Sequence, residues 1–140
     1  MPSLQVLLPK TDLKTRGAFA FLLTKAFVDA TEGRFDKNDF AVFFHEYGMG
    51  FASIGGKLWD DEDDFAPVHI ELSCPRLSRG QKKDIVELFT KALKEAGNKD
   101  WVVVIHISEH PYDNVGVSGK LLSDLIPGLS EKKFYYETKD

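Results

Sequence analysis

Apolar positions in the first half of the chain change spacing twice. Leu4-Gln5-Val6-Leu7-Leu8 is a short apolar segment typical of a strand. The apolar residues that follow recur three and four positions apart, which predicts an amphipathic helix: Phe19, Leu22, Leu23, Ala26, Phe27 and Ala30. Gly33 is expected to end this helix, and Phe40–Phe44 is the next apolar segment. The first half is therefore predicted to be strand, helix, strand.

The second half shows the same order. Val68–Leu72 predicts a strand, and Ser78 with Gln81 three residues later has the spacing of a capping box. The helix predicted after it has an apolar face made of Ile85, Leu88, Phe89, Ala92, Leu93 and Ala96. Gly97 is expected to stop this helix, and residues 102–107 are apolar almost throughout.

The two halves are also related in sequence. Residues 22–27 (LLTKAF) resemble residues 88–93 (LFTKAL), 66 positions later, and IGGKL at 54–58 resembles VSGKL at 117–121, 63 positions later. Connections tolerate such small changes of length. We predict one domain over residues 1–140, with β-α-β units at 2–58 and 66–125. Residues 126–140 form a C-terminal tail that contains Phe134-Tyr135-Tyr136.

Two strand–helix–strand units favour an α+β fold with right-handed parallel crossovers. Placed side by side, they predict a four-stranded sheet that carries two helices on one face. The strands are apolar over most of their length, which is typical of burial on both faces. We therefore expect another copy of the chain to cover the bare face. A dimer or a trimer would satisfy this argument.

Composition restricts the class of protein. Hydrophobic residues make up 43% and charged residues 29%, and the net charge is −4 with a pI near 5.6. An acidic chain is not typical of a nucleic-acid binder, and no apolar run approaches the roughly 18 residues of a membrane span. The start of the chain lacks a signal-peptide pattern, so a cytoplasmic location is expected. With one cysteine, Cys74, and four scattered histidines, no metal site is predicted.

Several segments together resemble a known family. Met1-Pro2 leads directly into the first strand, residues 74–78 read Cys-Pro-Arg-Leu-Ser before the second helix, and residues 114–121 lead into the second glycine turn. This order is similar to that of oxalocrotonate tautomerase and its relatives in the tautomerase superfamily. The resemblance implies the fold of the fused, two-unit members, a homotrimer with inward-facing sheets, and a catalytic amino-terminal proline.

Such a proline has a physical rationale. Once Met1 is removed, Pro2 carries a secondary amine, and burial and nearby cations lower the pKa of an amine. An amine that titrates near neutrality can remove a proton from carbon beside a carbonyl and return it elsewhere. An arginine would then hold the substrate carboxylate. The resemblance places Arg76 in that role, with Arg79 as the reserve candidate.

The sequence also departs from the family. An arginine found in the second strand of the oxalocrotonate enzymes is replaced by Ala41 and Val104, which favours a substrate with one carboxylate. Thr31 stands where the cis-chloroacrylate dehalogenases have a histidine, so dehalogenation is disfavoured. Asp39 matches an aspartate of malonate semialdehyde decarboxylase.

We therefore expect an enzyme: a cofactor-independent keto–enol tautomerase or isomerase of a small 2-keto acid or enol carboxylate. Two alternatives remain open at this point. One is a decarboxylase or hydratase of a small 3-oxo acid that uses Pro2 and Asp39. The other is a non-catalytic binding protein with the same fold, because fold alone does not fix function.

Overall fold

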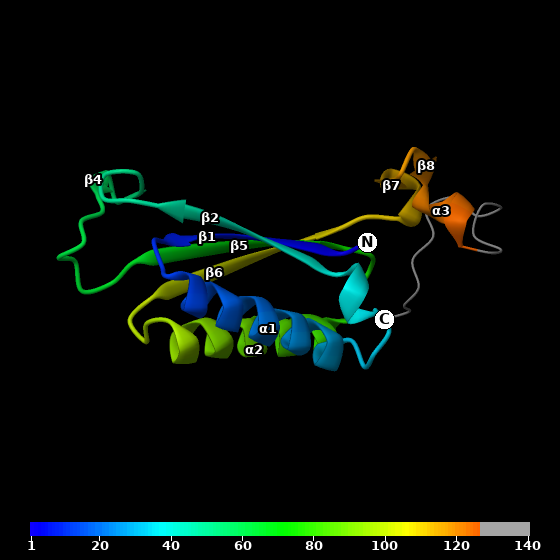
Figure 1. Cartoon of the computed structure of the whole chain (residues 1–140), viewed down its shortest axis with the longest axis horizontal. Helices are drawn as coiled ribbons and strands as arrows, with labels where there is room; N and C mark the ends of the chain where they lie inside the picture. The colour runs from blue at the N-terminus through cyan, green and yellow to red at the C-terminus, as the bar shows by residue number, and fades with distance from the viewer. Residues whose placement is uncertain (127–140) are drawn as a thin grey trace.

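The computed structural model describes residues 1–126 (Figure 1). The aromatic segment predicted in the C-terminal tail lies outside the described residues. The secondary-structure elements, in order along the chain, are β1 Ser3–Pro9, α1 Leu13–Ala30, the 3₁₀ turn Lys37–Asp39, β2 Ala41–Tyr47, β3 Ser53–Ile54, β4 Lys57–Leu58, β5 Pro67–Cys74, α2 Arg79–Ala96, β6 Val102–Glu109, the 3₁₀ turn Tyr112–Asn114, β7 Gly116–Val117, β8 Lys120–Leu121 and the short α3 Leu122–Leu125.

The main sheet has the strand order β2-β1-β5-β6. The pairs β1–β2 and β5–β6 are parallel, and β1 and β5 join the two units in an antiparallel pair. Helices α1 and α2 lie side by side and antiparallel on one face of this sheet (Figure 1). The structure therefore confirms the predicted α+β fold, a four-stranded sheet built from two β-α-β units with both helices on one face.

Local sequence signals explain where the helices begin and end. Asp12 caps α1 by accepting a hydrogen bond from the Thr15 N–H, and Ser78 caps α2 in a reciprocal capping box with Gln81. Helix α2 ends at Ala96, with Gly97 as its C-cap residue. A β-carbon at Gly97 would lie only 2.5 Å from the Trp101 ring and 2.6 Å from the Leu93 carbonyl oxygen. Glycine is thus required at position 97, because any side chain there would clash with the Trp101 ring and the Leu93 carbonyl.

The core lies between the sheet and the two helices. It is built from alternate residues of β1 and β5 and from the inner faces of α1 and α2, and its largest fully buried side chains include Leu4, Leu8, Phe19, Phe27, Ile70, Leu72, Ile85 and Phe89. Trp59 and Trp101 are also buried. At about 25 cal/mol per Å² of apolar surface, burying one such side chain stabilises the fold by roughly 1.5–3 kcal/mol.

The opposite face of the sheet is open in the single chain. It is less apolar than the sequence predicted for strands buried on both faces. Burial along β1 and β5 alternates, and β5 directs His69 and Glu71 outward. Apolar residues are nevertheless exposed there: Leu7, Phe43, Val102 and Val104. The open face is thus mixed in polarity, because the strands alternate more regularly than a strand buried on both faces would.

The two glycine turns are tight hairpins. β3 and β4 flank Gly55-Gly56, and β7 and β8 flank Ser118-Gly119. All four turn residues have positive φ, between 51° and 83°. This is the geometry of a two-residue turn that matches strand twist, and it explains why glycine recurs there. The sequence similarity between residues 54–58 and 117–121 thus corresponds to two equivalent hairpins at opposite ends of the sheet (Figure 1).

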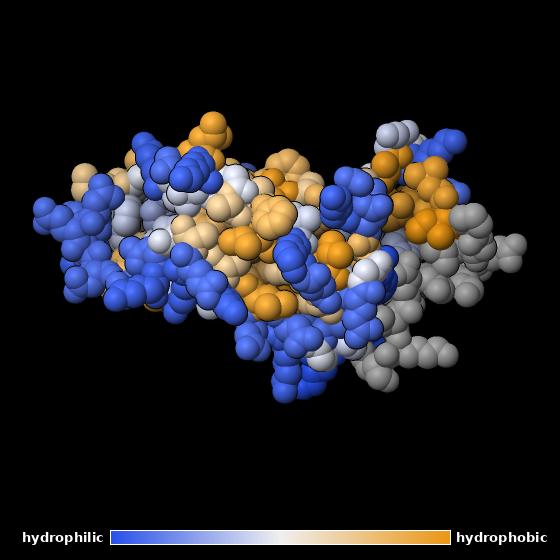
Figure 2. All heavy atoms as spheres, turned by 60° about the horizontal axis from the view of Figure 1, so that its bottom comes forward, coloured by the Kyte–Doolittle hydropathy of each residue, from blue (hydrophilic) through white to orange (hydrophobic). Residues whose placement is uncertain are grey.

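On the helix side, hydrophilic residues surround an area of apolar residues (Figure 2). Leu13, Phe21 and Val86 are exposed apolar residues of the two helices. Within residues 1–126, no helix has the length and apolar character needed to cross a membrane.

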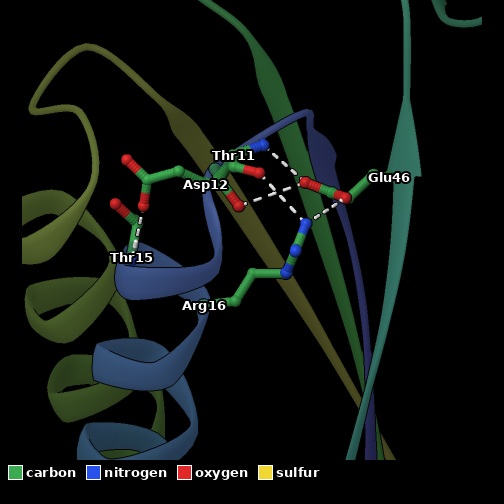
Figure 3. Close-up of polar contacts among 5 residues, drawn as sticks. All are labelled: Thr11, Asp12, Thr15, Arg16 and Glu46. Carbon is green, nitrogen blue, oxygen red and sulfur yellow. Dashed lines mark hydrogen bonds and ion pairs between the residues drawn. The ribbon is translucent and has the colours of Figure 1, made fainter.

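Each unit also contains the same polar connection between its second strand and its helix. Glu46, near the end of β2, accepts hydrogen bonds from the Thr11 N–H and from Arg16 Nη1, the latter at 2.5 Å (Figure 3). Glu109, at the end of β6, accepts from the Leu77 N–H at 2.6 Å and lies 2.6 Å from Lys82 Nζ. Each glutamate thus joins the start of a helix to the end of a strand.

Candidate active site

Strand register brings four separate segments to one end of the sheet. Ser3 pairs with Ala41 at the start of β2 and with Ser73 near the end of β5. The carbonyl oxygen of Pro2 accepts a hydrogen bond from the Ala41 N–H at 3.4 Å. Because β6 runs parallel to β5, its end and the turn after it reach the same edge. The first residues of the chain therefore lie where three other segments converge.

A cavity of about 180 Å³ opens at this edge. It is lined by residues from the chain start, the loop after α1, the end of β5 and the segment after β6: Met1, Pro2, Arg34, Phe35, Asp36, Asp39, Pro75, Tyr112, Leu122 and Ile126. Two of the sequence-predicted site residues, Pro2 and Asp39, thus line one cavity. They come together because β1 and β2 start side by side.

The amino group at the chain start titrates below its ordinary range. Partial burial lowers the pKa of the Met1 amino group, and the nearby negative charge of Asp39 acts in the opposite direction and raises it. Pro2 itself is buried, whereas the Met1 residue is 42% exposed. An amine carried by Pro2 would experience the same two influences from a less exposed position. Burial would favour its neutral form, which is the form that accepts a proton.

Arg34 supplies a cation to this cavity, and the sequence analysis did not select it. Its side chain is half-buried, and Nη1 donates a hydrogen bond of 2.7 Å to the carbonyl oxygen of Arg76. Its guanidinium lies 4.7 Å from the centre of the Phe35 ring, a cation–π distance. These contacts hold the guanidinium at the cavity wall. In the sequence, Arg34 is recognisable only as a cation directly after Gly33. The direction of its side chain depends on the conformation of a loop, which the spacing of apolar residues does not predict.

Arg76 and Arg79, the arginines predicted to bind the substrate carboxylate, lie just before α2 and at its first residue. Arg76 is half-buried in the turn before α2, and its carbonyl oxygen, not its side chain, is the group that contacts Arg34. Arg79 is exposed as the first residue of α2. Neither arginine is among the described residues that line the cavity. A direct role for either in substrate binding stays a prediction.

The remaining walls of the cavity are largely apolar. Tyr112, in the 3₁₀ turn after β6, is 3% exposed and closes one side together with Leu122.

The thiol of Cys74, next to Pro75, is fully buried, and burial together with the charge of Glu109 raises its pKa to about 12. Cys74 is therefore protonated at neutral pH and is a poor nucleophile. Within residues 1–126, no group of three or more His, Cys, Asp or Glu side chains is arranged to hold a metal ion.

Solved structures with the same fold exist. A fused 4-OT described as a wild-type asymmetric trimer has a TM-score of 0.73 at 18% identity, over 88% of this chain and 98% of its own. A member of the cis-3-chloroacrylic acid dehalogenase family has a TM-score of 0.65 at 21% identity, over 92% and 87%. The chain has the tautomerase-superfamily fold. Malonate semialdehyde decarboxylase is similar over 87% and 95%, with a TM-score of 0.58 at 18% identity.

No protein-family model matches the chain, and no curated protein does. The resemblance noted in the sequence is thus confirmed as a shared tautomerase fold. The structures with this fold include a tautomerase, a dehalogenase-family member and a decarboxylase with hydratase activity, so enzymes of several chemistries share it.

Proposed function

We propose that this chain is a cofactor-independent keto–enol tautomerase or isomerase of a small 2-keto acid or enol carboxylate. Pro2, exposed as the terminal residue by removal of Met1, acts as the acid and base. The observation that carries the proposal is the convergence of Pro2, Asp39 and Arg34 on one cavity. Burial there lowers the pKa of the Met1 amino group and would act in the same direction on an amine at Pro2. This combination supplies an amine that can accept and return a proton, a carboxylate and a cation within one small space.

The proposed reaction is a proton relocation. The neutral amine of Pro2 removes a proton from a carbon beside the substrate carbonyl, and the electron pair moves to the carbonyl oxygen as an enolate. The prolinium ion then returns a proton to another carbon or to the oxygen. No atom is gained or lost overall, so no redox partner is needed.

Arg34 is the proposed carboxylate-binding residue. Its Nη1 donates a hydrogen bond to the Arg76 carbonyl, and its planar guanidinium lines the cavity. A guanidinium can bind a carboxylate through two parallel hydrogen bonds. Arg76 would then act through Arg34 as a positioning residue, while Arg79 remains a candidate for a more distant part of the substrate.

Decarboxylation or hydration of a small 3-oxo acid is the second candidate. It is favoured by the proximity of Asp39 to the amino group, since the charge of Asp39 raises the pKa of that group. A carboxylate at this distance can hold an ammonium in its charged form or orient a water molecule. A structure with the same fold is malonate semialdehyde decarboxylase.

Assembly as a homotrimer is part of the proposal. Two solved fused 4-OT structures of this fold are trimers, one asymmetric and one symmetric. Exposed Leu7, Phe43, Val102 and Val104 on the open sheet face would be buried by such an assembly. Analytical ultracentrifugation tests it, and a monomer at micromolar concentration would contradict it.

Two measurements on the same preparation test the enzymatic proposal. Intact mass of the untagged protein shows whether Met1 is absent. A phenylenolpyruvate ketonisation assay then compares the wild type with Pro2→Ala, which keeps a small second residue. We expect loss of Met1 and a fall in kcat/KM of about 10²–10⁴-fold in the variant. A retained methionine, or activity indifferent to Pro2, favours a non-catalytic binding protein with this fold.

A further inference from the structure

The two ends of the sheet are built alike. Pro67 starts β5 as Pro2 precedes β1, and Lys10 follows the last residue of β1 as Arg76 follows Pro75 beyond β5. The dipeptides Pro9-Lys10 and Pro75-Arg76 lie 66 positions apart, the same interval that relates the two helices. Since β1 and β5 are antiparallel, these equivalent segments lie at opposite ends of the sheet.

The end opposite Pro2 contains the larger cavity. Its volume is about 590 Å³, within the range of small-molecule sites. The lining comes from the ends of β1 and β2, the start of β5 and the loop before β3, and includes Lys10, His45, Tyr47, Phe51, Pro67 and His69. The Tyr47 hydroxyl donates a hydrogen bond to the Pro67 carbonyl oxygen, which fixes one wall.

Lys10 and Phe51 face the same space in this cavity. A β-carbon at Gly48 would lie 3.9 Å from Lys10 Nζ and 4.0 Å from Phe51 Cδ2. An ammonium and an aromatic edge thus border the gap beside Gly48. Phe51 is 84% exposed, so its ring is accessible to a molecule bound beside Lys10.

The charge balance favours an anion. Lys10 is the cation among the described lining residues. The carboxylate of Glu46, also in the lining, is paired with Arg16 and accepts hydrogen bonds from Thr11, so its charge is compensated (Figure 3). His45 and His69 add ring nitrogens that can donate hydrogen bonds. Apolar walls with one cation suit a small monocarboxylate that has an apolar body.

We infer that this cavity is a second, non-catalytic binding site for a small apolar monocarboxylate, held by Lys10 and covered by Phe51. Pro67 lies within the chain, so its nitrogen is an amide without basicity and cannot exchange protons. The site therefore binds without the chemistry proposed for Pro2. None of its lining residues is shared with the Pro2 cavity, and the inference does not depend on the proposed catalysis. Leu7, which also lines the cavity, belongs to the sheet face that the proposed trimer would cover, so the site lies beside that interface.

The test uses 3-phenylpropionate as the probe, because it has one carboxylate and an aromatic ring and undergoes no keto–enol reaction. Titration calorimetry gives its affinity, and amide chemical shifts locate it. We expect the Gly48 and Phe51 amides to move, and Lys10→Met to weaken binding about 10-fold or more, because it removes the charge and keeps the stem. Lys14→Met, an exposed cation outside the cavity, should bind as the wild type does.

Two further variants separate this site from the first. Gly48→Val fills the gap between Lys10 and Phe51 from a backbone position that tolerates side chains, and it should also weaken binding. Pro2→Ala should leave this binding unchanged, whatever its effect on catalysis. Equal affinity in Lys10→Met and the wild type overturns the inference. So does an absence of binding to the wild type at millimolar probe, or amide shifts confined to Ser3 and Asp39.

Discussion

The carboxylate of Glu109 accepts a 2.6 Å hydrogen bond from the backbone N–H of Leu77. This contact joins the end of β6 to the turn before α2, and Lys82 completes it from the first turns of the helix. The turn contains Pro75 and Arg76, whose carbonyl oxygen orients Arg34. A contact outside the cavity thus positions one of its walls.

Removing this contact should destabilise the protein. Glu109→Ala leaves the N–H of the buried Leu77 and the ammonium of Lys82 without their acceptor, and we expect the free energy of unfolding to fall by about 1–3 kcal/mol. Urea denaturation measures the change. Glu95→Ala, at an exposed position late in α2, is the matched control. An unchanged midpoint in Glu109→Ala would show that water replaces the carboxylate without loss.

Arg34 should control substrate affinity. If its guanidinium holds the carboxylate, Arg34→Met should raise KM for phenylenolpyruvate by about 10- to 100-fold, the equivalent of one charge-assisted hydrogen bond or pair. Arg79→Met should change KM little, because Arg79 is exposed outside the cavity. The opposite ranking would return the binding role to the start of α2. A large loss of kcat in Arg34→Met at unchanged KM would instead indicate a role in the transition state alone.

Asp39 distinguishes the two candidate chemistries. Asp39→Asn should abolish decarboxylation or hydration of a 3-oxo acid, since both use the carboxylate together with Pro2. It should change simple ketonisation by only a few-fold, since that reaction needs the amine. Assays of both reactions on the same preparation check this. A comparable collapse of ketonisation would make Asp39 essential to the tautomerase reaction as well.

The pH profile should follow the amine. Burial lowers the pKa of the Met1 amino group below its ordinary value of about 8, and we expect the same direction for the Pro2 amine that replaces it. A base acts in its neutral form. The kcat/KM value should therefore rise with pH through this lowered pKa and be lost as pH falls below it. The charge of Asp39 raises the pKa, so Asp39→Asn should move the acid limb to lower pH. A shift to higher pH would be inconsistent with the electrostatics.

Gly97 should resist substitution for steric reasons. A β-carbon would approach the Trp101 ring at 2.5 Å and the Leu93 carbonyl oxygen at 2.6 Å, so we expect Gly97→Ala to destabilise the protein by about 1–3 kcal/mol. Gly17→Ala is the control, because that helical glycine has open space around it and alanine favours helix by up to about 1 kcal/mol. Thermal unfolding should move in opposite directions for the two variants.

The features that sequence predicted well are local or periodic. The Ser78–Gln81 capping box was readable because both partners lie within one helical turn. Asp39 was selected only from its match to malonate semialdehyde decarboxylase, and the parallel pairing of β1 and β2 brings it close to Pro2. The sheet and its two helices followed from apolar spacing and the repeat.

Arg34 shows where such reasoning stops. It lies in a loop, and its contact with the Arg76 carbonyl spans 42 positions of the chain. Neither spacing nor composition describes such a contact. No sequence pattern predicted that Glu46 and Glu109 would each accept a hydrogen bond from a backbone N–H. A glutamate at the end of a strand is more often solvated. Tertiary geometry, and not local preference, decides both cases.

Joining the two β-α-β units in one chain changes how the protein can vary. In an assembly of identical single units, every substitution appears at all symmetry-related positions at once. Here the equivalent positions of the two units are separate positions in one chain, and some already carry different residues: Lys10 corresponds to Arg76, and Arg16 corresponds to Lys82. Each end of the sheet can therefore accept substitutions that would be harmful at the other.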